Sequence, residues 1–190
     1  TVSTIIYNDI EITIPLPGRF NISNALAALT LGSELGIDVE TMKHGIESLK
    51  QIRGRVERVE CGQDFSVIID YAHTDDSLRK LYEAFPTSRK IAVLGSTGGG
   101  RDTWKRPVLG KIADEYCDEI IVTNEDPYDE DPMKIINEVA SGVTKHTPHL
   151  IIDRREAIAY ALSRAQTGDT VLISGKGTDP YIMEANGKKT

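Results

Sequence analysis

The amino-acid sequence predicts an α/β protein whose main part is a doubly wound, Rossmann-like and mainly parallel sheet. Two observations support this prediction. From about residue 65 onward, short apolar segments alternate with longer segments in which apolar residues recur at helical spacing. This alternation is typical of βαβ units, in which helices cover both faces of a parallel sheet. The preceding part of the chain follows a different pattern, which predicts a hairpin and two helices.

The first part begins with the predicted β-hairpin. Residues 2–7 and 10–15 alternate β-branched and polar residues around Asn8-Asp9, a pair typical of a tight turn. The segment 20–35 is rich in Ala and Leu and predicts a helix. A second helix is expected from Asp38 onward, because apolar residues then recur on one face.

The second part is predicted to contain five strands, at residues 65–69, 91–94, 119–122, 150–152 and 170–174. Helices are expected between them, and Asp131-Pro132 marks the start of one. The segment 51–55 interrupts the helical pattern and is the predicted domain junction, so the chain divides into 1–52 and 53–190. The first piece is smaller than an ordinary independent domain, and we expect it to be the end of a larger one.

Composition excludes several classes of function. The chain has 190 residues and a net charge of −7, which argues against a general surface for nucleic acids or membranes. A run of about 18 apolar residues, the length that spans a bilayer, is missing from the sequence. Cys61 and Cys117 are single and far apart, so neither a disulfide framework nor a cysteine metal site is expected. A cytoplasmic location is the resulting expectation.

Polar residues gather where the predicted strands end. Four such segments are rich in Gly, Asp, Lys, Arg and His, at residues 70–74, 95–102, 123–127 and 175–179. In open parallel sheets, ligands bind outside the carboxyl ends of the strands. Ordinary connections between strands and helices need only a cap and a glycine. The sequence therefore predicts one binding site at this edge of the sheet.

Each segment offers a particular chemistry. The carboxylate of Asp70 can accept two hydrogen bonds from a ribose diol, and His73 can contact a nucleotide or cap a helix. Arg101 follows three glycines and is a fork-shaped donor suited to a carboxylate, unless it lies on a flexible surface loop. Asp126, with the preceding Glu, can bind a substrate ammonium group or cap the next helix. Lys176 lies between two glycines and suits an anion, or an exposed tight turn.

The sequence lacks a Gly-x-x-x-x-Gly-Lys-[Ser/Thr] phosphate loop. The segment 95–102 has a similar glycine content, but it ends in Arg101-Asp102 where that motif has Lys followed by Ser or Thr. We therefore expect that this chain by itself does not hold a nucleoside triphosphate in the manner of that loop.

The chain resembles the Mur ligase family of ATP-dependent amino-acid ligases in four places. These are the Gly-Arg-Phe-Asn-x-x-Asn segment at 18–24, Arg-Gly-Arg at 53–55, Ile-Asp-Tyr-Ala-His-Thr at 69–74 and Gly-Lys-Gly at 175–177. The four segments occur in the family's order and with suitable spacing, so the resemblance covers essentially the whole chain. The set is most similar to the members that add the third residue of the peptidoglycan stem peptide.

This resemblance implies a reaction and a domain assignment. ATP phosphorylates the terminal carboxylate of UDP-MurNAc-L-Ala-D-Glu, and the amine of an amino acid attacks the acyl phosphate. Residues 1–52 then end the central ATPase domain, and 53–190 form the C-terminal domain, which acts as a lid. The phosphate loop, the magnesium ligands and the UDP-binding domain are expected upstream. The implied partners are these small molecules and the missing domains, and this chain alone is expected to be inactive.

The resemblance also implies roles for particular residues. Asn24 is expected near adenine, Arg55 near the terminal phosphates, Asp70 on the ribose and His73 beside the nucleotide. Arg55 and Lys176 are the candidate catalytic residues. The candidate amino-acid pocket comprises Arg101, Glu125, Asp126, Tyr128, Gly175 and Asp179. We expect no metal ligand among the residues of this chain.

One departure from the family pattern bears on the amino acid. Members that add meso-diaminopimelate carry Asp-Asn-Pro-Arg, whose Arg binds the distal carboxylate, whereas this chain has Glu125-Asp126-Pro127-Tyr128. Three more acidic residues follow at 129–131. Clustered carboxylates attract a cation and repel an anion, so L-lysine or another cationic diamino acid is favoured.

Two alternatives remain from the sequence. A cyanophycin or folylpolyglutamate synthetase shares this ligase architecture, and a UDP-sugar-binding domain upstream would separate the stem-peptide ligases from it. A non-catalytic module that only binds a nucleotide belongs to a different class, and amide-bond synthesis by the full-length protein would exclude it.

Overall fold

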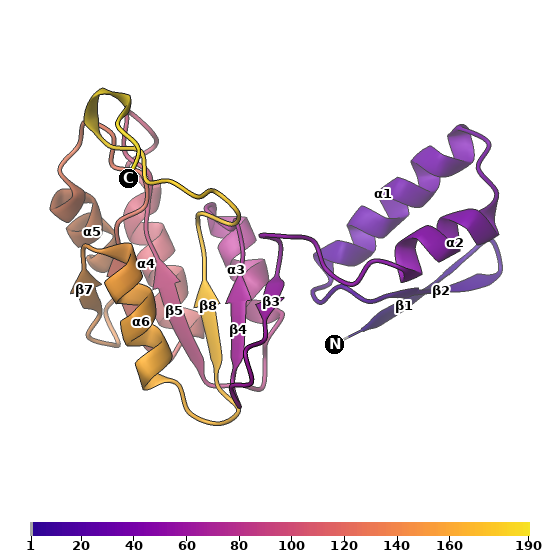
Figure 1. Cartoon of the computed structure of the whole chain (residues 1–190), viewed down its shortest axis with the longest axis horizontal. Coiled ribbons are helices and arrows are strands. Elements are labelled where there is room, and N and C mark those ends of the chain that lie inside the picture. The colour runs from indigo at the N-terminus through magenta and orange to yellow at the C-terminus, as the bar shows by residue number, and fades with distance from the viewer. Residues whose placement is uncertain (1) are drawn as a thin grey trace. The chain divides into compact units, whose positions relative to one another are not determined.

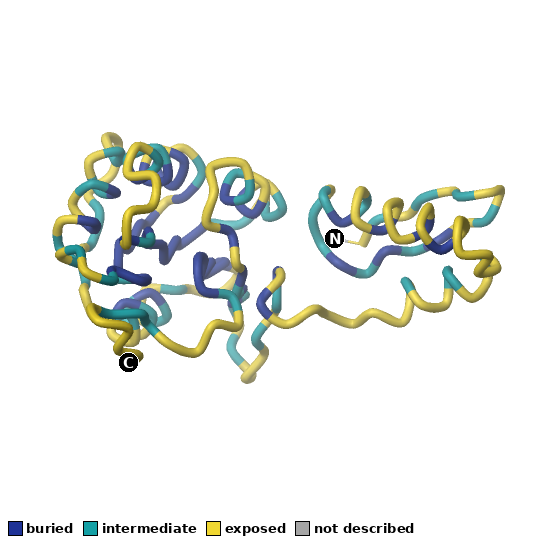
Figure 2. The backbone as a smooth tube through the Cα atoms, turned by 90° about the horizontal axis from the view of Figure 1, so that it is seen from above, coloured by how far each residue is buried: buried dark blue, intermediate teal, exposed yellow. Residues whose placement is uncertain are grey.

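A computed structural model describes residues 2–190. The chain divides into two compact units, Thr1–Ile52 and Arg53–Thr190. Each unit has apolar residues buried within it, and Figure 2 shows the buried positions concentrated along the strands of the second unit.

The first unit contains the predicted hairpin and both predicted helices. Strands β1 (Ser3–Tyr7) and β2 (Ile10–Ile14) are antiparallel, and helices α1 (Phe20–Glu34) and α2 (Val39–Glu47) follow. Asn8 and Asp9 have φ values of 49° and 61°, the left-handed conformation that a two-residue hairpin turn requires. Asp38 caps α2 by accepting a hydrogen bond from the backbone N–H of Thr41.

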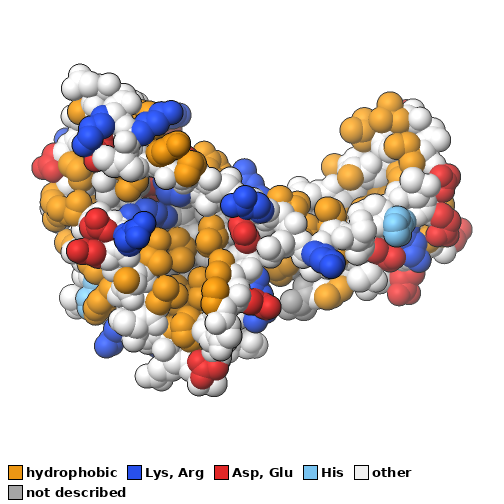
Figure 3. Space-filling view, in the orientation of Figure 1, with side chains coloured by type: hydrophobic (Ala, Val, Ile, Leu, Met, Phe, Trp, Pro, Cys, Tyr) orange, Lys and Arg blue, Asp and Glu red, His pale blue; other side chains and the backbone are white. Residues whose placement is uncertain are grey.

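Apolar side chains divide between the interior and the surface of the first unit. Ile14, Leu16 and Ala25 form a small buried cluster. By contrast, Leu31 and Leu35, at the C-terminal end of α1, are more than 60% exposed. Figure 3 shows apolar side chains on the surface at that end of the helix. Single exposed apolar residues are common, but a cluster of them marks a surface that another part of a protein can cover.

The second unit is a six-stranded sheet in the order β3-β4-β8-β5-β6-β7. Its strands are β3 (Glu57–Val59), β4 (Ser66–Ile69), β5 (Lys90–Leu94), β6 (Glu119–Thr123), β7 (His149–Ile151) and β8 (Thr170–Ile173). All neighbouring pairs are parallel except β3 with β4, so the predicted mainly parallel sheet is confirmed. The edge strand β3 was not predicted, because three residues with a central Arg carry no strand pattern.

Helices cover both faces of this sheet, as predicted. They are α3 (Asp75–Glu83), α4 (Lys105–Tyr116), α5 (Pro132–Ala140) and α6 (Arg154–Arg164). Helices α3, α4 and α5 pack side by side, whereas α6 packs on β5 to β8 and buries Ala157 and Ala161 there (Figure 1). Because both faces are covered, every residue of β5 and β6 is buried.

Asp114 of α4 holds the loop that follows α5. Its carboxylate accepts hydrogen bonds from the backbone N–H groups of Thr144, Lys145 and His146 at 2.8–3.1 Å, and it contacts the His146 ring. Burial opposes ionisation, yet these donors hold the pKa of Asp114 well below its ordinary value. A depressed pKa means that the ionised form stabilises the fold above the unfolded-state pKa, and that this contribution is lost as the pH falls.

We therefore predict that Asp114→Asn lowers the free energy of unfolding at pH 7 by about 1–3 kcal/mol, because the amide can no longer accept on both sides. Below pH 4 the difference from the parent chain should shrink, since the carboxylate of the unfolded parent chain becomes protonated there while that of the folded chain is still ionised. Urea unfolding at pH 7 and pH 3 checks this. A difference that is the same at both pH values would contradict the role of the ionised carboxylate.

Candidate functional site

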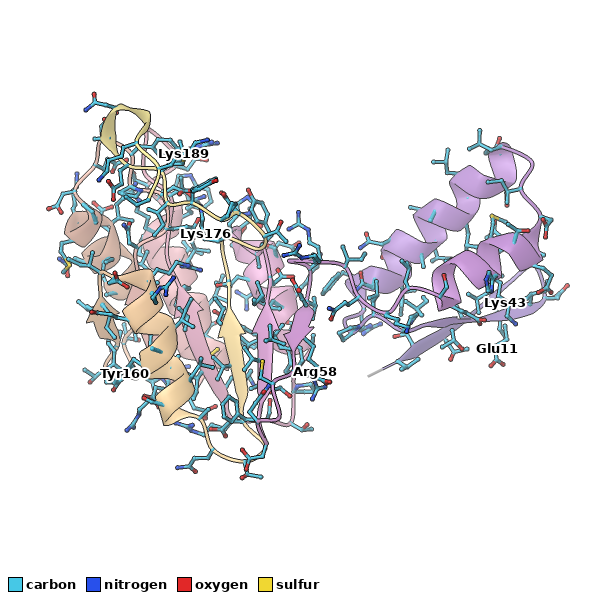
Figure 4. All side chains as sticks on the ribbon, in the orientation of Figure 1. Glu11, Lys43, Arg58, Tyr160, Lys176 and Lys189 are labelled. Atoms are coloured by element: carbon cyan, nitrogen blue, oxygen red, sulfur yellow. The ribbon has the colours of Figure 1, made fainter. Side chains whose placement is uncertain are left out.

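A cavity of about 390 Å³ opens at the carboxyl edge of the sheet, within the second unit. Figure 4 shows Lys176 at this edge, just beyond the end of β8. The cavity is lined by Tyr71, His73, Thr74, Asp75, Thr97, Arg101, Asp102, Trp104, Lys105, Glu125, Asp126, Tyr128, Gly175, Lys176, Asp179 and Met183. These residues come from all four of the strand-end segments, so the predicted convergence of those segments is confirmed. The volume suits a small polar molecule.

Lys176 is the buried cation of the cavity. Its ammonium donates to both carboxylate oxygens of Asp126 and to Asp179, each at 2.8 Å. Burial opposes the charge, but these two carboxylates raise the pKa of Lys176 above its ordinary value. An ammonium has three N–H donors, so its hydrogen-bonding capacity is met within the chain. The anions that Lys176 contacts within the chain are Asp126 and Asp179, and its expected contact with a ligand anion stays a prediction.

Glu125 and Gly175 bring two of the loops into close contact. The buried Glu125 carboxylate accepts a hydrogen bond from the Thr97 hydroxyl at 2.9 Å. Gly175 has a φ of 103°, and a Cβ there would lie 2.2 Å from Glu125 Oε2. The backbone conformation therefore favours glycine, and a side chain at this position would displace the Glu125 carboxylate. The loops after β6 and β8 are joined by the ion pair between Asp126 and Lys176.

The acidic cluster expected around residues 129–131 is dispersed in the structure. Asp129 accepts from the backbone N–H of Asn186, Glu130 pairs with Arg106 at 3.0 Å, and Asp131 caps α5. None of these three lines the cavity. The argument for a cationic side chain that relied on them was wrong, because each has a structural partner elsewhere.

The carboxylates that do line the cavity are accompanied by cations. Five carboxylates and three cations line the same cavity. The carboxylates are Glu125, Asp126, Asp179, Asp75 and Asp102, and the cations are Arg101, Lys105 and Lys176. The cavity is thus mixed in charge, and its chemistry suits a zwitterion, which carries both a carboxylate and an ammonium group.

The glycine-rich loop after β5 carries Arg101 to the cavity. The N–H of Gly98 donates to the Asp126 carbonyl at 2.7 Å, and the buried Arg106 donates to the Thr97 carbonyl. Tyr128 has a φ of 51° and donates its N–H to Met183, so its side chain is directed by a defined turn. These contacts bring Arg101 and Tyr128 to the same cavity.

Asp70, Arg55 and His73 lie around Tyr71. Both oxygens of the buried Asp70 carboxylate accept backbone N–H groups, from Val56 and Ala72, at 2.7 Å. Burial raises the pKa of Asp70, against these two hydrogen bonds and the nearby Arg55. A ribose diol would have to share oxygens that are already engaged. The Arg55 guanidinium lies 4.6 Å from the centre of the Tyr71 ring, and His73 hydrogen-bonds through Nδ1 to the Tyr71 carbonyl.

The structure thus brings most of the predicted residues together. His73, Arg101, Glu125, Asp126, Tyr128, Gly175, Lys176 and Asp179 line one cavity. Asp70 and Arg55 do not line this cavity but adjoin Tyr71, which does. Asn24 belongs to the first unit, where its side chain donates to Asn21. Sequence reasoning missed Thr97, although it lies in the predicted loop, and Met183, which follows the last strand without any motif.

Within residues 2–190, no group of three or more His, Cys, Asp or Glu side chains is arranged to bind a metal ion. In the same part of the chain, no helix has the length and apolar character needed to cross a membrane.

Comparisons with known proteins give a consistent result. A family model described as Mur ligase, glutamate ligase domain, matches residues 54–177. The UDP-N-acetylmuramoyl-L-alanyl-D-glutamate–2,6-diaminopimelate ligase of Caldanaerobacter subterraneus subsp. tengcongensis is 44% identical over 90% of this chain, which spans 36% of that relative. A solved structure of an enzyme of that name matches 98% of this chain and 39% of its own length, with 32% identity and a TM-score of 0.68. Folylpolyglutamate synthase from Mycobacterium tuberculosis has a TM-score of 0.70 at 19% identity, covering 91% of this chain and 44% of its own, which shows a shared fold alone.

Proposed function

The chain belongs to the Mur ligase family, and we propose that the longer protein containing it is an ATP-dependent ligase of peptidoglycan synthesis. In this proposal, ATP phosphorylates the terminal carboxylate of UDP-MurNAc-L-Ala-D-Glu. The amine of a diamino acid then attacks the acyl phosphate, and phosphate leaves as the amide bond forms. The second unit supplies the amino-acid pocket, and the first unit is the end of the ATPase domain.

The observation that carries the proposal is the mixed charge of the cavity. Arg101 is a fork-shaped donor suited to the α-carboxylate of an amino acid. Glu125 and Asp179 supply acceptors for an ammonium group, while Lys176 neutralises part of the acidic charge. Such a cavity binds a zwitterion with a cationic side chain more readily than a simple anion.

The nucleotide and its metal are proposed to be bound mainly by segments outside this chain. Within residues 2–190 no cluster of acidic or His side chains fits a magnesium ion. Magnesium would supply charge neutralisation at the phosphates of ATP. Arg55, Asp70, His73 and Asn24 remain proposed nucleotide contacts, and closure of such groups over an acyl phosphate would limit its hydrolysis.

We further propose L-lysine, or another diamino acid with one carboxylate, as the amino acid. Tyr128 lines the cavity at the position where the resemblance places the arginine that binds the second carboxylate of diaminopimelate. The curated relative named above is a diaminopimelate ligase, so the two amino acids must be compared directly.

An amino-acid screen with the full-length enzyme tests both parts of the proposal. UDP-MurNAc-L-Ala-D-Glu, ATP and one of L-lysine, L-ornithine, meso-diaminopimelate or L-glutamate are incubated together, and the product and ADP are measured. Ligation of L-lysine with the highest kcat/KM is the expected result. A preference for meso-diaminopimelate would overturn the choice of lysine only. Ligation of none of the amino acids to this acceptor would overturn the assigned reaction.

A substitution at Tyr128 should shift this preference. Tyr128→Arg places a guanidinium at the cavity, and one bidentate carboxylate contact is worth about 1.5–3 kcal/mol. We therefore expect kcat/KM for meso-diaminopimelate to rise by about tenfold relative to L-lysine. Tyr128→Phe serves as the control, because it keeps the ring and adds no charge. An unchanged ratio for Tyr128→Arg would show that this position does not face the distal end of the amino acid.

A further inference from the structure

Arg154 connects two loops that line the cavity, although it does not line the cavity itself. It is the first residue of α6, and its guanidinium donates to the carbonyl of Ser174 at 2.7 Å and to that of Asn124 at 3.2 Å. Ser174 follows β8 and Asn124 follows β6, two strands that β5 separates in the sheet. One side chain therefore connects two strand ends that share no backbone hydrogen bonds.

Both acceptor carbonyls immediately precede residues that line the cavity. Asn124 is followed by Glu125 and Asp126, and Ser174 is followed by Gly175. Because Gly175 lies directly against the Glu125 carboxylate, a displacement of either loop changes the position of that carboxylate. Arg154 itself does not line the cavity among the described residues, so any effect on a ligand passes through these neighbours.

The charge of Arg154 also bears on the site. Burial lowers the pKa of its guanidinium, and the carboxylates of Glu125 and Asp126 act against that shift. Arginine stays protonated through such an effect at neutral pH. A fixed positive charge therefore lies close to two carboxylates of the cavity and reduces the free energy cost of keeping both ionised there.

We propose that Arg154 is a positioning residue for the amino-acid pocket, one that sets the spacing of the loops after β6 and β8 and thereby the placement of Glu125. This inference rests on the proposed function. A guanidinium can donate to two carbonyls at once from a planar fork, whereas a lysine ammonium in its place supplies the charge without the same geometry. The role therefore predicts graded effects for Lys and Met at this position.

The fold offers a matched control in Arg89. Its guanidinium pairs with Asp169 at 2.6 Å and Glu119 at 2.7 Å. Glu119 begins β6 and Asp169 precedes β8, so Arg89 joins the same two strands at the opposite edge of the sheet. A substitution at Arg89 therefore removes a connection between β6 and β8 that lies away from the cavity, and it shows the effect of losing such a connection by itself.

The experiment measures kcat, the KM values for amino acid and ATP, and thermal stability in full-length ligase carrying Arg154→Met, Arg154→Lys or Arg89→Met. Loss of positioning by a fraction of an ångström should raise the amino-acid KM of Arg154→Met by about tenfold, with the ATP KM changed less than about twofold. Arg154→Lys should lie between this variant and the parent. Arg89→Met should lower the melting temperature and leave both KM values within about twofold of the parent.

Several outcomes would overturn the proposal. Equal increases in the two KM values for Arg154→Met, or the same amino-acid KM for Arg154→Met and Arg89→Met, would reduce Arg154 to a structural contact. If Arg154→Met does not fold, an unchanged amino-acid KM in Arg154→Lys would do so. The parent enzyme keeps the two proposals apart, because its failure to ligate any amino acid would overturn the proposed function itself.

A second measurement does not depend on activity. In amide NMR spectra of this chain, Arg154→Lys should shift the signals of Glu125, Asp126 and Gly175, whereas Arg89→Lys should leave them in place. Equal shifts from both substitutions would contradict a specific effect of Arg154 on the cavity.

Discussion

Replacing Lys176 with Met is expected to lower the free energy of unfolding by about 3–5 kcal/mol, because removal of one partner leaves buried charge uncompensated. Asp126, with 9% of its surface exposed, would lose its cation. Asp179 is more exposed and would be solvated instead. The same substitution should remove measurable ligation in the full-length enzyme, since Asp126 also holds the N–H of Met183 at the cavity.

Urea unfolding of this chain, followed by circular dichroism, measures the first effect. Lys188→Met is the matched control, because Lys188 forms an exposed pair with Glu184 that should contribute less than about 1 kcal/mol. Adding Asp126→Asn to Lys176→Met should restore part of the stability, since the buried charge is then removed as well. A double variant as unstable as the sum of the two single variants would contradict the pairing.

The pair also predicts a dependence on pH. The pKa of Lys176 is raised in the folded chain, so its contribution is complete below the unfolded-state value of about 10.4 and is lost as the pH rises further. The pKa of Asp179 is lowered, chiefly by its hydrogen bond from Lys176, so its contribution is present above about 3.9 and is lost as the pH falls. The stability difference between the parent and Lys176→Met should therefore be largest between these two limits.

The location of the site could be predicted from the sequence because it follows from topology. Strand-end segments in a parallel sheet meet at one edge whatever their detailed conformation, so residues as distant as His73 and Asp179 were expected together and line one cavity. The strands themselves were recognisable because β5, β6 and β8 are buried on both faces and have runs of three or four apolar residues. The short polar strand β3 has no such signal.

The partners of individual polar residues could not be predicted in the same way. Glu130 and Asp131 follow the cavity segment in the sequence, yet one pairs with Arg106 and the other caps a helix. Lys176 appeared to be a glycine-flanked donor for a ligand, whereas Asp126 and Asp179 occupy its hydrogens. These outcomes depend on distances of a few tenths of an ångström between segments that are far apart in sequence, and residue type alone does not determine them.

Asp70 shows how a motif residue can have a structural role that the motif does not reveal. Its carboxylate accepts the N–H of Val56, which has a φ of 48°, an unfavourable conformation for a β-branched residue. Val56 lies just after Arg55 in the segment that begins the second unit, and its side chain is buried. Asp70 therefore fixes the strained start of this unit to the end of β4.

We predict that Asp70→Ala lowers the free energy of unfolding of this chain by about 2–5 kcal/mol without any nucleotide present, because the N–H groups of Val56 and Ala72 would both be left buried and unpaired. Asp76→Ala is the control, since Asp76 is exposed and pairs only with Lys80 among the described residues. Chemical denaturation of the two variants gives the comparison. If they were equally stable, Asp70 would not hold Val56, and its carboxylate would be free to serve the ribose as first expected. If a large loss of stability is confined to Asp70→Ala, that variant is too unstable to report on nucleotide binding. The ATP KM of the full-length enzyme should then be measured in Asp70→Asn, which keeps one acceptor oxygen and more of the fold.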